Sequence, residues 1–375
     1  MILHRRGFVA GALAAPFMTP VASAAGRIAI DDGVKVAEPS TLGFDADALR
    51  STMAHVRDGA TNVHSVLVMR HGRLAAELYR SGSDRSIYSL WGSRRSFGPS
   101  DRHDMRSVSK SVVSLLYGIL LARGEAPDID VSVPSLFPDC PELDDPARRA
   151  IRIRHLLTMS AGLDWMEPSP VRRASSSDEI GLVYRSCAYR YVFARDIVAA
   201  PGAAFTYNGG LTEVIAEIVA RSAKRPLRDI ARDELFAPLG IVDWEWTGNL
   251  YGDPIAAAGL RLAPRDLMKI GAMVLAGGRW QGRQVVPADW IAESTKAGLA
   301  TPPLGGYGYQ WWTMTTQRKD RPVNVVAAIG NGGQRLFLAP DLDLALVTTA
   351  GDYNDPAINA PLKAILGEVV RSVAA

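Results

Sequence analysis

Residues 107–113 read SVSKSVV, and this stretch says more about the fold than any other part of the 375-residue chain. A serine hydroxyl stands three residues before a lysine amine, and an apolar run follows as far as Leu120. Residues i and i+3 share one face of a helix, so the amine of Lys110 can point at the oxygen of Ser107. A serine at a helix start also lies where the dipole favours a developing oxyanion. The pattern therefore predicts a helix over 107–122 that presents a nucleophilic serine beside a lysine.

Two simpler interpretations of these residues remain open from the stretch alone. Ser107 could cap the helix with its hydroxyl, and Lys110 could be a surface lysine. To act as a base near neutral pH, Lys110 must lose its proton, so we expect burial or a nearby cation to lower its pKa. The apolar residues that follow favour burial of the lysine.

Residues 1–24 are typical of an export signal. The pair Arg5-Arg6 precedes an apolar stretch that ends near Met18, and Ala22-Ser23-Ala24 matches an A-x-A cleavage site. A membrane anchor is the alternative, but the apolar stretch is shorter than the ~20 residues that span a bilayer. We therefore expect the twin-arginine export machinery as a partner, no stable membrane anchor after cleavage, and a periplasmic or secreted location.

The charge and the cysteine content exclude other classes of function. The chain has 42 Lys and Arg against 39 Asp and Glu, and removing residues 1–24 removes two arginines and no acid. The nearly neutral remainder gives no reason to expect a nucleic-acid partner. Cys140 and Cys187 are the only cysteines, and either a disulfide or two free thiols is possible. These cysteines and six scattered histidines form no metal-ligand pattern, so we expect neither a metal nor a cofactor.

Hydrophobic patterning places strands near both ends of the chain and helices between them. Strand-like runs occupy 65–70, 74–79, 307–313, 323–329, 335–338 and 344–349, with helices expected over 44–57 and 356–373. Helical periodicity dominates the middle, at 107–122, 211–223, 227–235, 264–275 and 287–294. We predict an α+β fold of two lobes, with an antiparallel sheet built from both chain ends and flanked by helices. The expected sheet lobe is 25–99 with 300–375, the mainly helical inserted lobe is 100–299, and a cleft between them is the default site.

Four segments together resemble the class C β-lactamase and DD-peptidase superfamily of serine hydrolases, in particular its branch of esterases and 6-aminohexanoate-dimer hydrolases. They are MRSVSKS at 105–111, RHLLTMSAGLDW at 154–165, PGAAFTYNGG at 201–210, and GNGGQ at 330–334 followed by Pro340. Their order and spacing match the family across nearly all of the mature chain. The resemblance implies a two-lobe serine β-lactamase-like fold and hydrolysis through an acyl-serine.

The resemblance assigns roles to three residues. Ser107 would be the nucleophile, Lys110 its base, and Tyr207 a proton relay to the leaving group. A half-buried aromatic in a turn is the alternative for Tyr207, because a tyrosine in a glycine-rich loop is common.

The third motif implies an oxyanion hole. A strand edge without bulky side chains lets backbone amides face the substrate, so the amide of Gln334 could act with that of Ser107. Gly333, Asn331 and Asn208 would bind substrate nearby; a plain glycine-rich turn is the alternative for the third motif.

The remaining candidates are less defined. Asp164 and Trp165 would either line the site or be a turn residue and a core aromatic. Four aromatics at 307, 309, 311 and 312 alternate on the expected strand, so one face could form a wall of the cleft.

Two departures from the family pattern affect the expected substrate. Gly209 stands where the tyrosine motif often has an amide-binding asparagine, and Asn331 stands where β-lactam-recognising members have lysine or histidine. We therefore expect an exported hydrolase of small esters or amides rather than an efficient β-lactamase. The alternatives are β-lactamase or D-amino-peptidase activity, or a non-catalytic penicillin- or peptidoglycan-binding protein on the same scaffold.

Overall fold

The structure is a computed structural model that describes residues 30–87, 89, 91–167, 177–301, 305–319 and 321–374. The expected export signal at 1–24 lies outside the described residues.

A nine-stranded sheet joins the two ends of the chain, in the order β1-β3-β2-β16-β15-β14-β13-β12-β11. Its strands are β1 (Lys35–Val36), β2 (Val63–Arg70), β3 (Arg73–Tyr79), β11 (Leu299–Thr301), β12 (Gly305–Tyr307), β13 (Trp312–Arg318), β14 (Arg321–Gly330), β15 (Gln334–Ala339) and β16 (Leu344–Ala350). The pairing of β2 with β16 joins the N-terminal and C-terminal strands, as the sequence predicts. The sheet is mixed rather than wholly antiparallel, because the edge strand β1 pairs parallel to β3.

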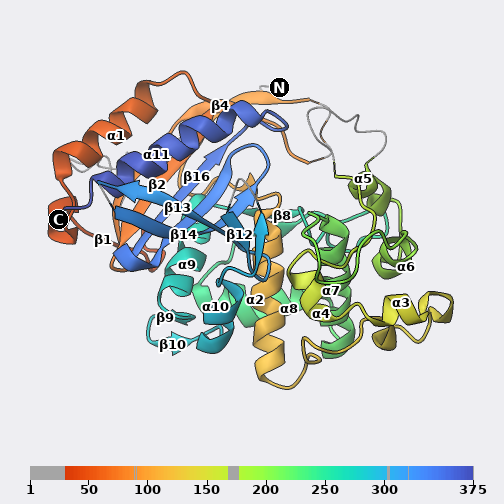
Figure 1. Ribbon diagram of the computed structural model, residues 1–375. Coiled ribbons are helices and arrows are strands. Elements are labelled where there is room, and N and C mark those ends of the chain that lie inside the picture. Colours follow the sequence, from red (N-terminus) through yellow and green to blue (C-terminus); the bar gives the residue numbers. More distant parts are fainter. Residues whose placement is uncertain are drawn as a thin grey trace, which may run out of the picture.

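Helices cover both faces of the sheet (Figure 1). Helices α1 (Ala46–Asp58) and α11 (Asn359–Arg371) pack together on one face, and α9 (Pro264–Leu275) packs on the other. Alternation along β2 explains this arrangement, since successive strand side chains point to opposite faces. Val66 and Val68 join the core beneath α1 and α11, whereas Leu67 and Met69 join the larger core on the opposite face.

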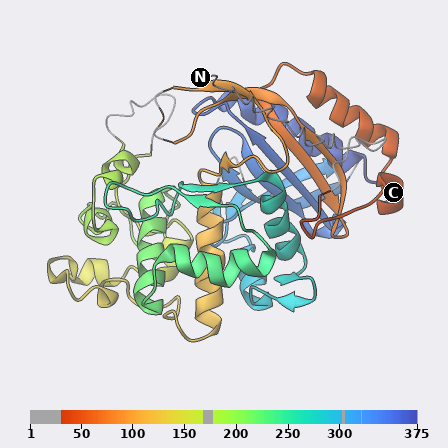
Figure 2. The ribbon, with the colours of Figure 1, turned by 180° about the vertical axis from the view of Figure 1, so that it is seen from behind.

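The middle of the chain forms a mainly helical region beside the sheet (Figures 1 and 2). Its helices are α2 (Val108–Ala122), α3 (Pro146–Arg149), α4 (Ile153–Leu157), α5 (Asp178–Val183), α6 (Ala188–Phe193), α7 (Gly209–Ala223), α8 (Leu227–Ile230), the π-helix η5 (Ala231–Phe236) and α10 (Ala288–Ser294). Helix α2 is almost wholly buried, and it packs against α7, α10 and strand β14. It therefore lies where the helical region meets the sheet.

Short elements complete the described chain. The small strands are β4 (Ser81–Asp84), β5 (Ser93–Ser96), β6 (His103–Asp104), β7 (Glu245–Trp246), β8 (Leu260–Leu262), β9 (Arg279–Trp280) and β10 (Arg283–Gln284). The 3₁₀ helices are η1 (Pro39–Leu42), η2 (Pro134–Leu136), η3 (Pro141–Leu143), η6 (Ala237–Leu239), η7 (Pro340–Leu342) and η8 (Pro356–Ile358). Strand β6 leads directly into the residues before α2 and pairs with β8.

Two local expectations from the sequence are wrong. A single strand over 307–313 does not form, because the chain turns between β12 and β13 and Gln310 takes a left-handed φ of 67°. The side chain of Gln310 binds the carbonyls of Leu156 and Leu157, and these buried bonds hold the turn. The helix expected over 227–235 changes from α to π after Ile230. Cys140 and Cys187 are both free thiols.

Candidate active site

The first turn of α2 brings Ser107 and Lys110 together. Ser107 is the N-cap residue, but its hydroxyl makes no capping hydrogen bond. Instead, Lys110 Nζ lies 3.0 Å from Ser107 Oγ, and the lysine is only 2% exposed. The hydroxyl therefore faces an amine that burial keeps away from bulk water, and neither the capping serine nor the surface lysine describes this structure.

The backbone before Ser107 is held in an uncommon conformation. Arg106 has a left-handed φ of 50°, which costs energy for a residue other than glycine. Its guanidinium lies over the ring of Tyr353, 4.4 Å from the centroid. The end of β14 approaches the same segment so closely that a Cβ on Gly330 would collide with the carbonyl of Met105. Glycine at 330 thus lets the sheet edge reach the start of α2.

Tyr207 completes a compact group with Ser107 and Lys110. Lys110 Nζ is 5.0 Å from the centre of the Tyr207 ring, and the phenol interacts with the side chains of both Ser107 and Lys110. Trp312 stacks on the ring with a centroid separation of 5.8 Å. Tyr207 immediately precedes Asn208, the N-cap of α7, so the start of this helix fixes its position.

The carboxylate of Glu167 occupies the space next to Lys110 that a side chain at position 209 would otherwise fill. Glu167 Oε1 accepts hydrogen bonds from the Gly209 amide at 2.6 Å and from Trp165 Nε1 at 2.9 Å. A Cβ at Gly209 would lie 3.0 Å from this oxygen and 3.6 Å from Lys110 Nζ. The group that faces Lys110 here is therefore an acceptor from another loop, rather than an asparagine amide.

The charges around Lys110 change its expected ionisation. Burial disfavours the ammonium, but Tyr207, Glu167 and Glu179 outweigh it and raise the pKa of Lys110 above its usual value. The expected lowering of this pKa is therefore wrong for the resting site. Burial also raises the pKa of Tyr207, and Lys110 partly offsets this rise. In the resting site the lysine is an ammonium and the tyrosine a neutral phenol.

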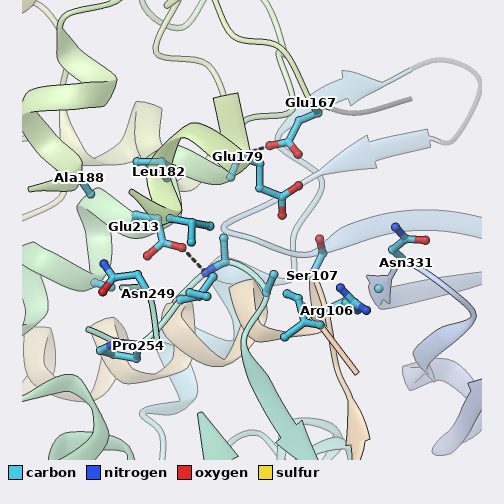
Figure 3. A pocket seen from close by; sticks show the side chains of 18 of the residues that line it. Arg106, Ser107, Glu167, Glu179, Leu182, Ala188, Glu213, Asn249, Pro254 and Asn331 are labelled. Carbon is cyan, nitrogen blue, oxygen red and sulfur yellow. Dashed lines mark hydrogen bonds between the residues drawn. The ribbon is translucent and has the colours of Figure 1, made fainter. Parts of the chain in front are cut away.

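Two further carboxylates, Glu179 and Glu213, line the cavity (Figure 3) and interact electrostatically with Lys110. Burial, with the neighbouring charge of Glu167, raises the pKa of Glu179 on α5 to about 7. Burial likewise raises the pKa of Glu213 on α7 to about 7, although two backbone amides and Lys110 act in the opposite direction. Both groups therefore change charge near neutral pH.

A cavity of about 1230 Å³ opens over these residues. Ser107 and Tyr207 line its middle, and Arg106, Asn331 and Arg335 line the side next to the sheet. The other side reaches between α5, α7 and the segment from 249 to 258, with these residues in its wall: Leu182, Val183, Ala216, Ala220, Asn249, Pro254 and Ile255. This volume is ample for a small organic substrate, and Ser107 lies between the two sides of the cavity.

The third motif is a tight connection between β14 and β15, and only part of it faces the cavity. Asn331 and Gly332 line the cavity, whereas Gly333 and Gln334 do not. Gln334 is buried and donates from Nε2 to the Ala350 carbonyl at 2.5 Å. In the described part of the chain, the amides of Ser107 and Asn331 have no hydrogen-bond acceptor. The structure therefore favours the amide of Asn331 over that of Gln334 as an oxyanion donor.

The other predicted binding residues have structural roles. Asn208 caps α7 by accepting from the Leu211 amide at 3.2 Å, and it does not line the cavity. Asp164 is exposed, and its amide binds the Asp196 carbonyl. Trp165 is buried and orients Glu167 through its indole N–H, so it supports the site without lining the cavity.

The aromatic wall is smaller than the sequence suggests. Trp312 lines the cavity, whereas Tyr307 and Trp311 are buried in the core and Tyr309 packs near Trp290. The turn between β12 and β13 separates these side chains, so they do not alternate along a single strand.

The cavity side next to the sheet contains one deeply buried cation. Arg335 donates to the carbonyls of Gly330 and Gln334 and to Asn359 Oδ1. Burial lowers the pKa of Arg335 to about 10. Its guanidinium is thus occupied in holding the β14–β15 connection.

Sequence reasoning missed all three glutamates near Lys110. Glu167 and Glu179 lie in or after a loop without periodicity, and Glu213 precedes Glu217 by four residues, a spacing typical of a solvated helix face. Within the described ranges, no set of three or more His, Cys, Asp and Glu side chains is arranged to hold a metal ion. No helix in the same ranges is long and apolar enough to cross a membrane.

The β-lactamase family matches residues 47–367 of this chain. The chain belongs to the β-lactamase family. It is 29% identical over 350 residues to a 6-aminohexanoate-dimer hydrolase from Paenarthrobacter ureafaciens, covering 87% of this chain and 81% of that protein. It is also 29% identical over 223 residues to Esterase EstB from Burkholderia gladioli, covering 55% of this chain and 54% of that protein.

The fold agrees with this family assignment. A putative 6-aminohexanoate-dimer hydrolase from Bacillus anthracis superposes with a TM-score of 0.68 at 18% identity, covering 83% of this chain and 79% of that one. The resemblance and the β-lactamase-like fold class predicted from the sequence are thus confirmed. This member of the β-lactamase family is a serine hydrolase.

Proposed function

We propose that the protein is an exported enzyme that hydrolyses small esters or simple amides through an acyl-enzyme on Ser107. The observation that best supports this function is the 3.0 Å approach of Lys110 Nζ to Ser107 Oγ at the floor of a cavity large enough for a substrate. The similar proteins from P. ureafaciens and B. gladioli, named a 6-aminohexanoate-dimer hydrolase and an esterase, support the choice of substrate class.

Acylation begins when Ser107 Oγ attacks the substrate carbonyl carbon. The hydroxyl proton passes to the Lys110–Tyr207 pair, which acts as the base after it has lost one proton. Because the phenol interacts with both the serine and the lysine, the proton can reside on either member of the pair. We therefore assign the role of general base to the pair rather than to Lys110 alone.

The negative charge on the carbonyl oxygen needs donors that do not move. The amides of Ser107 and Asn331 supply them in our proposal, because both residues line the cavity and both N–H groups lack an acceptor in the described chain. Preorganised amides of this kind stabilise a tetrahedral intermediate strongly. Tyr207 then passes the proton to the leaving oxygen or nitrogen as the carbonyl–leaving group bond breaks. Water next attacks the acyl-serine and gives a proton to the same pair, and the pair passes this proton to Ser107 Oγ as the acyl–Oγ bond breaks and the acid is released.

Substrate preference follows from the groups on each side of Ser107. Glu167 fills the space at Gly209 and can only accept hydrogen bonds while ionised, so no side-chain amide donor holds a substrate carbonyl there. On the opposite side, Asn331 is bound to Asn354 by a 2.6 Å side-chain bond, and Arg335 is directed at backbone carbonyls. A β-lactam therefore lacks both its amide anchor and its usual carboxylate anchor.

We expect a p-nitrophenyl short-chain ester to be hydrolysed with a higher kcat/KM than a chromogenic cephalosporin. A hydrogen bond to a charged group is worth roughly 1.5–3 kcal/mol, so the missing carboxylate contact alone corresponds to about one to two powers of ten. A short-chain ester needs only the nucleophile, its base and the oxyanion amides. Steady-state rates with both substrates decide the point, and faster cephalosporin turnover would instead make the protein a β-lactamase.

Glu179→Gln is expected to move the pH dependence of kcat/KM to lower pH. Glu179 raises the pKa of Lys110, so removing its charge lets the Lys110–Tyr207 pair lose its proton at lower pH. Its own pKa of about 7 means that Glu179 is ionised throughout the alkaline range where the lysine titrates. At pH values where wild-type activity still rises with pH, the variant should be several-fold faster.

The pH profile of ester hydrolysis measures this shift. Glu293→Gln provides the control, because Glu293 is an exposed acid outside the cavity and should leave the profile unchanged. An unshifted profile for Glu179→Gln would mean that the rising limb does not report the Lys110–Tyr207 pair.

Export is part of the proposal and rests on Arg5-Arg6 and Ala22-Ser23-Ala24. We expect processing in a host with twin-arginine export to leave Ala25 at the N-terminus. N-terminal sequencing of protein recovered from outside the cytoplasm tests this expectation, with Arg5→Lys/Arg6→Lys as the export-deficient control. Full-length, unprocessed protein from wild-type cells would contradict it.

A further inference from the structure

Glu213 uses both of its carboxylate oxygens to hold the backbone of a neighbouring segment. Its two oxygens accept from consecutive amides, that of Ala256 at 3.0 Å and that of Ala257 at 2.9 Å. No lysine or arginine of the described chain forms an ion pair with it by direct contact. Residues 256 and 257 are at most 2% exposed, so the carboxylate takes the place of bulk water as the acceptor of their amides.

The segment held by Glu213 also holds Lys110. The carbonyl of Ala257 accepts a hydrogen bond from Lys110 Nζ at 3.0 Å, the same distance that separates Nζ from Ser107 Oγ. One bond therefore anchors the nitrogen to the backbone while another directs it to the serine. A continuous series of hydrogen bonds runs from the Glu213 carboxylate, through the Ala256–Ala257 backbone and Lys110, to the hydroxyl of Ser107.

We propose that Glu213 is a positioning residue that fixes Lys110 on Ser107 by clamping the Ala256–Ala257 backbone. The inference rests on the proposed function and deepens it, because it names a residue that acts on the general base through the backbone. The ionised carboxylate offers a strong acceptor oxygen to each of the two amides. A glutamine at 213 has one acceptor oxygen, and its NH₂ group would meet the second N–H donor to donor.

Other ionisable groups lie in the same surroundings, and their effects must be separated from that of Glu213. Those that face Lys110 or Glu213 come from every neighbouring element: Tyr207, Glu167, Glu179 on α5, and Asp253 before β8. Glu179 matters most, because it also titrates near pH 7 and its protonation acts on Lys110 in the opposite sense. The pH experiment therefore compares Glu179→Gln with the double variant Glu179→Gln/Glu213→Gln.

Two measurements test the clamp in the full mature chain. The first is hydrolysis of a p-nitrophenyl short-chain ester, and the second is the second-order rate of labelling Ser107 with a fluorophosphonate, which requires little substrate recognition. For Glu213→Gln we expect kcat and the labelling rate to fall together by about 10- to 100-fold, with KM within about twofold of wild type. Glu213→Asp keeps both carboxylate oxygens on a shorter side chain, so its kcat and labelling rate should lie between those of Glu213→Gln and wild type.

The pH dependence distinguishes a clamp from a merely structural residue. In the Glu179→Gln background, a plot of log kcat/KM against pH should rise with a slope of about two below pH 7. In this range both Glu213 and the Lys110–Tyr207 pair must lose a proton before the enzyme is active. With Glu213→Gln added, the slope should be about one across the range. Ile215→Val, a buried change on α7 that also reduces stability modestly, should leave rate and slope unchanged.

Each outcome is decisive. The clamp would be overturned if Glu213→Gln kept wild-type kcat and labelling rate, or if only its KM rose. It would also be overturned if adding Glu213→Gln left the pH slope unchanged, or if Ile215→Val lost as much activity as Glu213→Gln. If Glu213→Gln does not fold, Glu213→Asp is judged by the same criteria. Absence of ester hydrolysis and of Ser107 labelling in the wild type would instead refute the proposed function itself.

Discussion

Ser107→Ala is expected to reduce kcat for ester hydrolysis by roughly 10⁴–10⁶-fold, because the substitution removes the oxygen that the proposed mechanism acylates. The residual rate would come from binding and from the oxyanion amides, which do not depend on the hydroxyl. The fold should be unaffected, since the Ser107 hydroxyl makes no capping bond and its described partner is Lys110. Steady-state kinetics with a p-nitrophenyl ester measure the loss.

Ser114→Ala provides the matched control for this substitution. Ser114 lies two turns further along α2, is fully buried, and its hydroxyl has no hydrogen-bond partner in the described chain. Its loss should leave kcat within about twofold of wild type. Comparable activity in Ser107→Ala and Ser114→Ala would place the nucleophile elsewhere.

Lys110→Met is expected to lower kcat by about 10²–10⁴-fold, the usual contribution of a general acid–base group. Methionine fills most of the space of the buried lysine but cannot accept the serine proton or donate to the Ala257 carbonyl. The acyl-enzyme should therefore form slowly, so the pre-steady-state burst of p-nitrophenol release should be slower than in wild type. Rapid mixing with the ester measures this step directly.

Lys269→Met is the matched control for Lys110→Met, because it removes a buried lysine charge without removing the proposed base. Lys269 is also 2% exposed, and it pairs with Asp266 at 2.9 Å on α9, away from the cavity. This variant should lose stability because it leaves Asp266 unpaired, but its folded molecules should keep wild-type kcat. A Lys110→Met variant that folds and retains the wild-type burst rate would show that the base lies elsewhere.

The sequence predicts the sheet and the nucleophile helix well because both depend on local patterns. The strand-like runs at 65–70 and 344–349 appear as β2 and β16, and the apolar run after Lys110 appears as the buried helix α2. The spacing of Ser107 and Lys110 on one helical face likewise fixes their 3.0 Å approach, because i and i+3 side chains must meet.

The surroundings of Lys110 depend on contacts between distant segments, and no local pattern reports them. Glu167 approaches Gly209 from 42 residues away, and Glu213 binds a backbone segment 43 and 44 residues downstream. The pKa of Lys110 is raised rather than lowered because Tyr207, Glu167 and Glu179 gather around it, whereas burial alone would lower it. Asn331 rather than Gln334 faces the cavity because the β14–β15 connection is tight, with Gly332 and Gly333 at positive φ.

Fluorophosphonate labelling followed by intact-mass analysis and peptide mapping identifies which serine of the protein is activated as a nucleophile. Ser107 is the only serine three residues before a lysine, and its hydroxyl is the one that faces Lys110 Nζ. The account predicts one adduct per chain, on the peptide that contains Ser107, with none in Ser107→Ala. An adduct on Ser109 or Ser160 that persists in Ser107→Ala, or no adduct on a folded wild-type protein, would contradict it.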